Sequence, residues 1–95
     1  MKPKFGICAP ATVFVSALED FSWDFLSGMA LRAEELGYHS MWMADHLFSD
    51  NAECWTTLTA IGAVTKRLAL GQHVMAMPFR PPSLLAKMAA TLDYY

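Results

Sequence analysis

Two ionisable side chains, Asp45 and His46, directly follow a short apolar segment, residues 40–44, that is predicted to be a β-strand. An imidazole titrates near neutral pH, and a carboxylate beside it can orient it and tune its charge. In α/β proteins, ligands and chemistry gather at the carboxyl ends of parallel strands. Asp45 and His46 are therefore candidate catalytic residues, with His46 bonding to a ligand or moving a proton. The alternative is an ordinary loop histidine beside a loop-capping aspartate.

Polar residues also interrupt the third apolar segment, residues 68–75. Gly71 lies within it, and a glycine inside a strand often marks a bulge or a close approach of the backbone. Gln72 and His73 are polar in a strand that should be buried. They are either ligand contacts at a distorted strand end or a buried polar pair that bonds to its neighbours. His39 begins the preceding strand, at the opposite edge of the sheet, and is interpreted as structural.

Three further charged residues have simpler interpretations. Arg80 lies in a proline-rich turn and either binds an anionic group or pairs with a surface acid. Glu34 and Glu35 fall on the polar face of a predicted helix and are expected to be solvated. The sequence contains no P-loop, no Gly-x-Gly-x-x-Gly after a strand and no His-Glu-x-x-His. The missing glycine cluster argues against a Rossmann dinucleotide fold, and no metal site is predicted.

The elements that must position these residues alternate between strand and helix. The predicted strands are residues 4–9, 40–44 and 68–75. The predicted helices run over about residues 21–36, about residues 52–66, and from Pro81 or Pro82 to the chain end. Spacings of three and four give the first helix its expected apolar stripe, made of Phe21, Phe25, Met29, Ala33 and Leu36. The sequence Asp50-Asn51-Ala52-Glu53 is expected to form a capping box at the start of the second helix.

The β-α-β-α-β-α order, with strands starting about 30–35 residues apart, is typical of right-handed βαβ units around a parallel sheet. Each strand is apolar along most of its length, as expected when both faces are buried. A three-stranded parallel sheet would leave two unpaired edges, whereas a (β/α)₈ barrel needs about 250 residues. We therefore expect residues 1–95 to be the amino-terminal portion of such a barrel, comprising its first three β/α units.

Composition excludes several classes of protein. Of the residues, 55% are hydrophobic and 17% are charged, and the net charge is −2. Nothing in this balance favours nucleic acid or an anionic membrane as a partner. The sequence has no apolar run of membrane-spanning length and no secretory leader, and Cys8 and Cys54 form no Cys-x-x-Cys pair. A cytoplasmic protein with reduced thiols is therefore expected.

Four segments resemble the luciferase-like monooxygenase superfamily. They are Ala33-Glu34-Glu35-Leu36-Gly37-Tyr38 leading into Met41-Trp42-Met43-Ala44-Asp45-His46, then Glu53-Cys54-Trp55-Thr56-Thr57-Leu58, then Arg67-Leu68-Ala69-Leu70-Gly71, and finally Pro78-Phe79-Arg80 with Leu84 to Asp93. The resemblance implies a (β/α)₈ barrel that binds FMN or the deazaflavin coenzyme F-420 at the carboxyl ends of its strands. It also implies an oxidoreductase or monooxygenase acting on a small organic substrate.

The resemblance implies roles for individual residues as well. Several deazaflavin-dependent members use an Asp-His pair after the second strand, beside the ring system, and Asp45-His46 matches it, with Asp45 expected to orient the imidazole. Several members carry a non-prolyl cis peptide in a bulge of the third strand, and the matching bond here lies near His73-Val74. With Gln72 included, the predicted cofactor contacts are His46, Gln72, His73 and Val74.

Two other functions stay open. The first is a non-catalytic barrel fragment that assembles with another chain. The second and third helices are rich in small residues and could pack in a homodimer or within one barrel; these residues are Ala60, Gly62, Ala63, Ala86, Ala89 and Ala90. The other is a metal-dependent hydrolase with Asp45 and His46 as ligands, although the sequence has no second spaced His pair.

Overall fold

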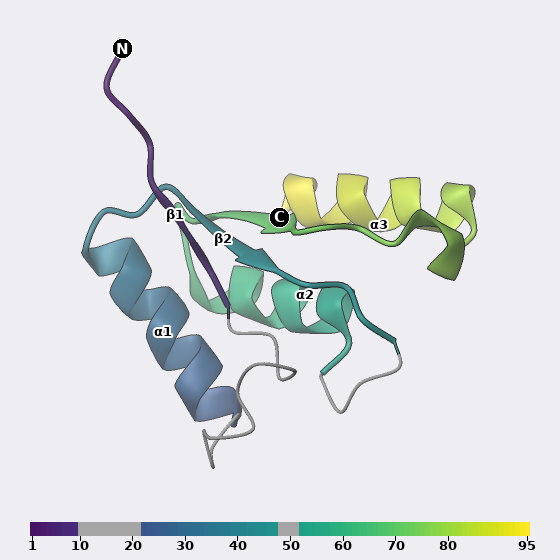
Figure 1. Ribbon diagram of the computed structural model, residues 1–95, viewed down its shortest axis with the longest axis horizontal. Coiled ribbons are helices and arrows are strands. Elements are labelled where there is room, and N and C mark those ends of the chain that lie inside the picture. The colour runs from purple at the N-terminus through teal and green to yellow at the C-terminus, as the bar shows by residue number, and fades with distance from the viewer. Residues whose placement is uncertain (10–21, 48–51) are drawn as a thin grey trace.

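Three short strands form one parallel sheet in the order β1-β2-β3 (Figure 1). The computed structural model describes residues 1–9, 22–47 and 52–95. The strands are β1 (Gly6–Cys8), β2 (Ser40–Met43) and β3 (Ala69–Gln72), and the helices are α1 (Trp23–Glu35), α2 (Cys54–Val64), the short 3₁₀ helix η2 (Met77–Phe79) and α3 (Pro82–Tyr94). The predicted alternation of strand and helix is therefore confirmed, and it is consistent with the start of a barrel.

The three strands run level with one another. Trp42 in the central strand pairs with Cys8 on one side and Gly71 on the other. Just beyond the paired residues, the Ala9 N–H donates to the Trp42 carbonyl oxygen at 2.7 Å, and the His73 N–H donates to the Met43 carbonyl oxygen at 2.9 Å. All three strands therefore deliver the residues that follow them to the same edge of the sheet.

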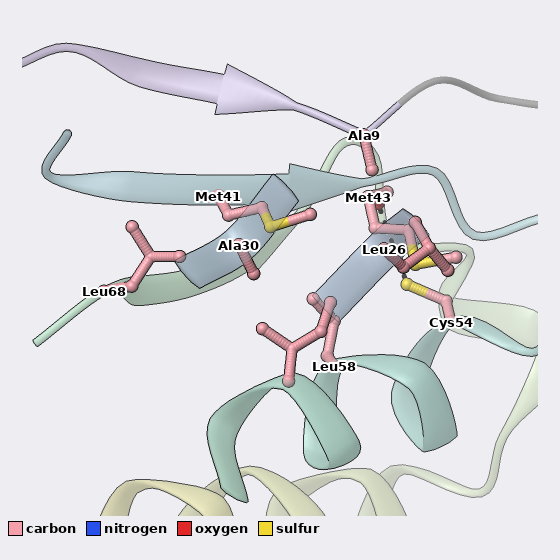
Figure 2. Packing of buried hydrophobic residues seen from close by; sticks show 9 residues of the cluster. Ala9, Leu26, Ala30, Met41, Met43, Cys54, Leu58 and Leu68 are labelled. Atoms are coloured by element: carbon pink, nitrogen blue, oxygen red, sulfur yellow. Dashed lines mark hydrogen bonds between the residues drawn. The ribbon is translucent and has the colours of Figure 1, made fainter. Parts of the chain in front are cut away.

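One face of the sheet is covered by α1 and α2, which lie on the same side of it (Figure 1). Met41 and Met43 of β2 point toward these helices and are 0% and 4% exposed. Figure 2 shows them among side chains of α1 and α2, namely Leu26, Ala30, Cys54 and Leu58. Because side chains alternate along a strand, Ser40 and Trp42 point to the other face.

The buried stripe of α1 matches the predicted one only in part, since Ala33 is buried and Met29 packs against the core as expected. It begins after Ser22, whose hydroxyl accepts a hydrogen bond from the Phe25 N–H at 3.2 Å. Its buried residues are Leu26, Ala30 and Ala33, whereas Phe25 and Leu36 are exposed. The small side chains of Ala30 and Ala33 in the buried stripe allow α1 to pack closely. Phe21, the expected start of the helix, lies outside the described residues.

The helix α2 is capped by Glu53, and the expected cap at Asp50 and Asn51 lies outside the described residues. The Glu53 carboxylate accepts a hydrogen bond from the Thr56 N–H at 2.7 Å, as an N-cap side chain does. The helix ends at Val64, earlier than predicted. In the third helix, all of which is described, Leu85 is the buried side chain, and the rest of the predicted apolar face is half-buried or exposed.

The sequence suggested that Glu34 is solvated, but its carboxylate is engaged in hydrogen bonds to the backbone. One oxygen of its carboxylate, Oε1, accepts hydrogen bonds from three consecutive backbone N–H groups, those of Lys66, Arg67 and Leu68, at 2.8, 2.5 and 3.0 Å. These bonds, that of Arg67 above all, hold the pKa of Glu34 below its ordinary value. Glu34 therefore ties the end of α1 to the segment that leads into β3, at the amino edge of the sheet.

Candidate functional site

The structure brings His46 and His73 to the carboxyl edge of the sheet. His46 lies three residues beyond the end of β2, His73 directly follows β3, and both side chains are exposed. His39 is also exposed but lies at the amino edge, where its N–H donates to the Phe5 carbonyl oxygen at 2.8 Å. Two of the three histidines of the sequence are thus placed where the chemistry of parallel α/β sheets is found.

An open depression of about 270 Å³ lies on the face of the sheet that α1 and α2 do not cover. It is lined by Gly6, Ile7, Cys8, Trp42 and His73. The Trp42 indole spans this face, and its Nε1 donates to the Ser40 hydroxyl at 3.0 Å. A Cβ added to Gly6 would lie 2.8 Å from Nε1, and one added to Gly71 would lie 2.4 Å from Cζ3. Glycines on both neighbouring strands therefore make room for the indole.

The depression is mostly apolar in its lining, and the exposed His73 is one of its lining residues, a combination that is common in small-molecule sites. Ligand pockets typically enclose about 300–1,000 Å³, and this depression of about 270 Å³ lies just below that range. Arg80 does not line the depression, and its guanidinium is already paired with two carboxylates.

Gln72 does not share this site. It pairs with Met43 in the register of the sheet, and its side-chain Nε2 donates to Cys54 Sγ at 3.6 Å. The side chain therefore points into the helix-covered face, away from the depression. Gln72 is half-buried and bonds to a neighbouring side chain, as the alternative interpretation expects, and its contact with a cofactor stays a prediction. Burial raises the pKa of the Cys54 thiol to about 11.

The peptide bond between His73 and Val74 is cis. This is the position at which the resemblance implied a non-prolyl cis bond. The Val74 side chain that follows is 73% exposed. Both residues thus lie at the open rim of the sheet, next to the depression that His73 lines.

A buried ion-pair network lies beside His46. Arg80 donates from Nη1 to Asp45 Oδ2 at 2.6 Å and from Nη2 to Asp45 Oδ1 at 2.8 Å. Arg80 Nη2 also donates to Glu53 Oε1, and the Ala76 N–H donates to Asp45 Oδ2 at 3.0 Å. The side chains of Arg80 and Asp45 are 10% and 1% exposed. Hydrogen bonding to Arg80 holds the pKa of the Asp45 carboxyl below its ordinary value, although burial opposes this.

This network bears on two expectations. Asp45 was expected to orient the His46 imidazole; its two oxygens accept hydrogen bonds from Arg80, and its role toward His46 stays a prediction. Arg80 was expected to bind an anion or to pair with a surface acid, and it pairs with two acids, one of which is buried. Sequence reasoning missed Glu53 as a member of this group. The available signal was that Glu53 and Arg80 both lie in the segments that carry the family resemblance.

Within the described residues, no three His, Cys, Asp or Glu side chains are grouped so that they could hold a metal ion. In the same residues, no helix has the length and apolar character needed to cross a bilayer. The candidate site therefore consists of the exposed His46 and His73, the Trp42 indole and the ion-pair network around Arg80.

Consecutive parallel β/α units with polar residues at the carboxyl edge place the chain in the α/β class. Within that class, the sequence model of the family described as luciferase-like monooxygenase matches residues 1–95. The chain belongs to the luciferase-like monooxygenase family, as its four sequence segments suggested.

The chain is also similar to individual proteins of known sequence. It is 33% identical over 88 residues to an F420-dependent glucose-6-phosphate dehydrogenase of Microbacterium testaceum, covering 83% of this chain and 26% of that protein. It is 30% identical over 89 residues to a protein of the same name from Amycolatopsis mediterranei, covering 84% of this chain and 26% of that protein. It is 31% identical over 68 residues to the uncharacterized protein YvbT of Bacillus subtilis, covering 68% and 20%. The chain spans about a quarter of the length of the first two relatives.

The names of the first two relatives agree with the expected use of FMN or F-420 in this family. The family and these relatives support an oxidoreductase as the general kind of protein.

Proposed function

We propose that this chain is the amino-terminal portion of a (β/α)₈ barrel that acts as an F-420- or FMN-dependent oxidoreductase on a small organic substrate. One observation carries the proposal: the exposed imidazoles of His46 and His73 follow neighbouring parallel strands at one edge of the sheet. His73 also lines the depression on the uncovered face. The relatives named F420-dependent support F-420 as the first cofactor to test.

The chain's own residues would do three things in this function. Trp42 forms an apolar floor beneath the ring system, held in place by Ser40 and the flanking glycines. His73 and the exposed Val74 contact the ring system from the rim of the sheet. His46 donates a hydrogen bond to the cofactor or substrate, or moves a proton between a reacting atom and solvent. When bound, FMN or F-420 supplies the hydride or oxygen chemistry.

The test is a titration of the full-length protein with F-420 and, separately, with FMN, followed by the absorbance and fluorescence of the cofactor. We expect saturable binding of one of the two. Glucose 6-phosphate is the first substrate to assay, because two relatives are named for it. Where turnover is found, His46→Ala should lower it about 100-fold, since a positioned acid–base group contributes about 100- to 10,000-fold.

His39→Ala is the matched control, because His39 is an exposed histidine at the opposite edge of the sheet. It should bind cofactor and turn over substrate as the wild type does. If neither cofactor binds to the full-length protein, the proposed function is wrong. If His46→Ala matches the wild type in both binding and turnover, His46 has no part in the site.

One observation bears on the alternative of assembly through the small residues of α2 and α3. A Cβ on Gly62 would lie 3.2 Å from the Leu92 Cδ1 and 3.3 Å from the Leu70 Cδ1. Gly62 thus already packs closely against α3 and β3 of its own chain. This favours packing within one barrel over an interface between copies for that residue.

A further inference from the structure

We propose that Arg80 is a positioning residue for His46: by binding Asp45, it fixes the backbone immediately before the imidazole without touching the ligand. This inference rests on the proposed function of His46. It adds a residue that lies on a different loop, 35 positions along the chain from the Asp45 carboxylate that it binds.

Arg80 joins both sides of the loop that contains His46. On one side is Asp45, the residue immediately before His46, which Arg80 binds through two parallel N–H···O bonds. On the other side is Glu53, the N-cap of α2, which Arg80 binds through Nη2. A two-point contact to a carboxylate restricts its orientation as well as its position, so it also restricts the direction in which the next residue leaves β2.

The loop after β3 is tied to the same point. Arg80 follows η2 (Met77–Phe79), and the Ala76 N–H donates to Asp45 Oδ2 at 3.0 Å. The segment that begins with His73 and the segment that begins with Asp45 are therefore locked together. Because one histidine lies on each segment, the network sets the separation of the two imidazoles at the edge of the sheet.

The guanidinium is not free to bind a ligand anion itself. Its Nη1 and Nη2 are engaged by two carboxylates, and its side chain is 10% exposed. Removal of Arg80 would leave Asp45, which is 4% exposed, as a buried charge without its cationic partner. A lysine would keep the charge but could not reproduce the forked contact. Arg80→Lys therefore keeps the positive charge beside Asp45 but removes the two-point contact that orients the Asp45 carboxylate.

The experiment is a double-mutant cycle in the full-length protein with Arg80→Lys, His46→Ala and the double variant. The readouts are the dissociation constant of F-420 (or FMN, whichever binds the wild type) and the visible absorption spectrum of the bound cofactor. A displaced His46 loses its hydrogen bond to the cofactor, so we expect Arg80→Lys to weaken binding by up to about tenfold and to shift the spectrum. In the His46→Ala background, Arg80→Lys should raise the dissociation constant of the cofactor by less than about a further twofold, because Arg80 acts through His46.

Arg32→Lys is the matched control, since Arg32 forms an exposed ion pair with Glu35 on the surface of α1. It should leave both readouts unchanged. Asp45→Asn is a second variant that weakens the same contact and should reproduce the spectral shift if Arg80→Lys does not fold.

The outcomes separate the two proposals. Wild-type binding and spectrum in both Arg80→Lys and Asp45→Asn would overturn the inference and leave the proposed function standing. An equal loss from Arg80→Lys with and without His46 would also overturn it, because Arg80 would then act independently of the imidazole. If the wild type binds neither cofactor, or if His46→Ala changes neither readout, the proposed function of His46 fails first and the inference fails with it.

Discussion

The Trp42 indole lies against the backbone of Gly71, its partner across the β2–β3 pair, so closely that the glycine cannot carry a side chain without movement of one or the other. A Cβ on Gly71 would lie 2.4 Å from Cζ3 and 2.6 Å from Cε3 of the indole. The indole is also fixed by the hydrogen bond from its Nε1 to the Ser40 hydroxyl. Gly71 therefore shapes the floor of the depression on the uncovered face of the sheet.

Gly71→Ala should destabilise the full-length protein by about 1–3 kcal/mol, because it overpacks the contact with Trp42. It should also weaken cofactor binding, since the indole must tilt to make room. Thermal unfolding and the cofactor titration measure the two effects. Gly28→Ala is the control, because Gly28 lies inside α1 and a Cβ there would meet nothing within 4 Å.

Alanine at position 28 should be neutral or stabilise the protein by up to about 1 kcal/mol through its higher helix propensity. Combining Gly71→Ala with Trp42→Leu should recover part of the lost stability, because the smaller side chain relieves the contact. Equal stability of the two alanine variants would show that the indole does not press on Gly71.

Glu34→Gln should destabilise the full-length protein more than Glu35→Gln does. Glu34 accepts hydrogen bonds from three backbone N–H groups, whereas Glu35 forms an exposed ion pair with Arg32. Exposed ion pairs contribute little to the free energy of unfolding. Because folding lowers the pKa of Glu34, its contribution is present above the pKa of the unfolded state and is lost as the pH falls through the folded-state pKa.

The difference in unfolding free energy between the wild type and Glu34→Gln should therefore be largest near pH 7 and shrink below about pH 4.5, the ordinary value for this carboxyl. Denaturant titrations at a series of pH values measure it. A difference that does not change with pH would mean that the ionised carboxylate is not what ties α1 to the segment before β3.

The two cysteines should differ sharply in reactivity. Cys54 is 1% exposed, and burial raises its pKa to about 11, so very little thiolate is available at neutral pH. Cys8 is exposed and lines the depression beside Trp42. Iodoacetamide should label Cys8 in the native full-length protein and Cys54 only after unfolding, as peptide mass spectrometry will show.

Saturating F-420 or FMN should slow the labelling of Cys8, because the proposed ring system covers that face of the sheet. Cys8→Ser removes the native-state label and serves as the control. Labelling of Cys8 at the same rate with and without a bound cofactor would place the cofactor elsewhere.

Local sequence was enough to predict the order of the elements, the parallel sheet and the edge at which His46 and His73 lie. Apolar periodicity, prolines and glycines act over a few residues, and parallel βαβ units have one handedness, so the topology follows from a local pattern. The ends of the helices and strands were predicted less accurately. For example, α2 begins after Glu53, which caps it, and ends at Val64, before the predicted end.

The partners of the charged and polar side chains were decided by the tertiary structure alone. Arg80 and Asp45 are separated by 35 positions, and Glu34 and Arg67 by 33, and no periodicity links residues so far apart. The face of the sheet to which the Gln72 side chain points likewise depends on the register of β3 against β2, because successive side chains in a strand point to opposite faces. The sequence by itself determined which residues reach the carboxyl edge. Packing of α1, α2 and the loop after β3 against the sheet determined which of them are exposed there and which are engaged by other side chains.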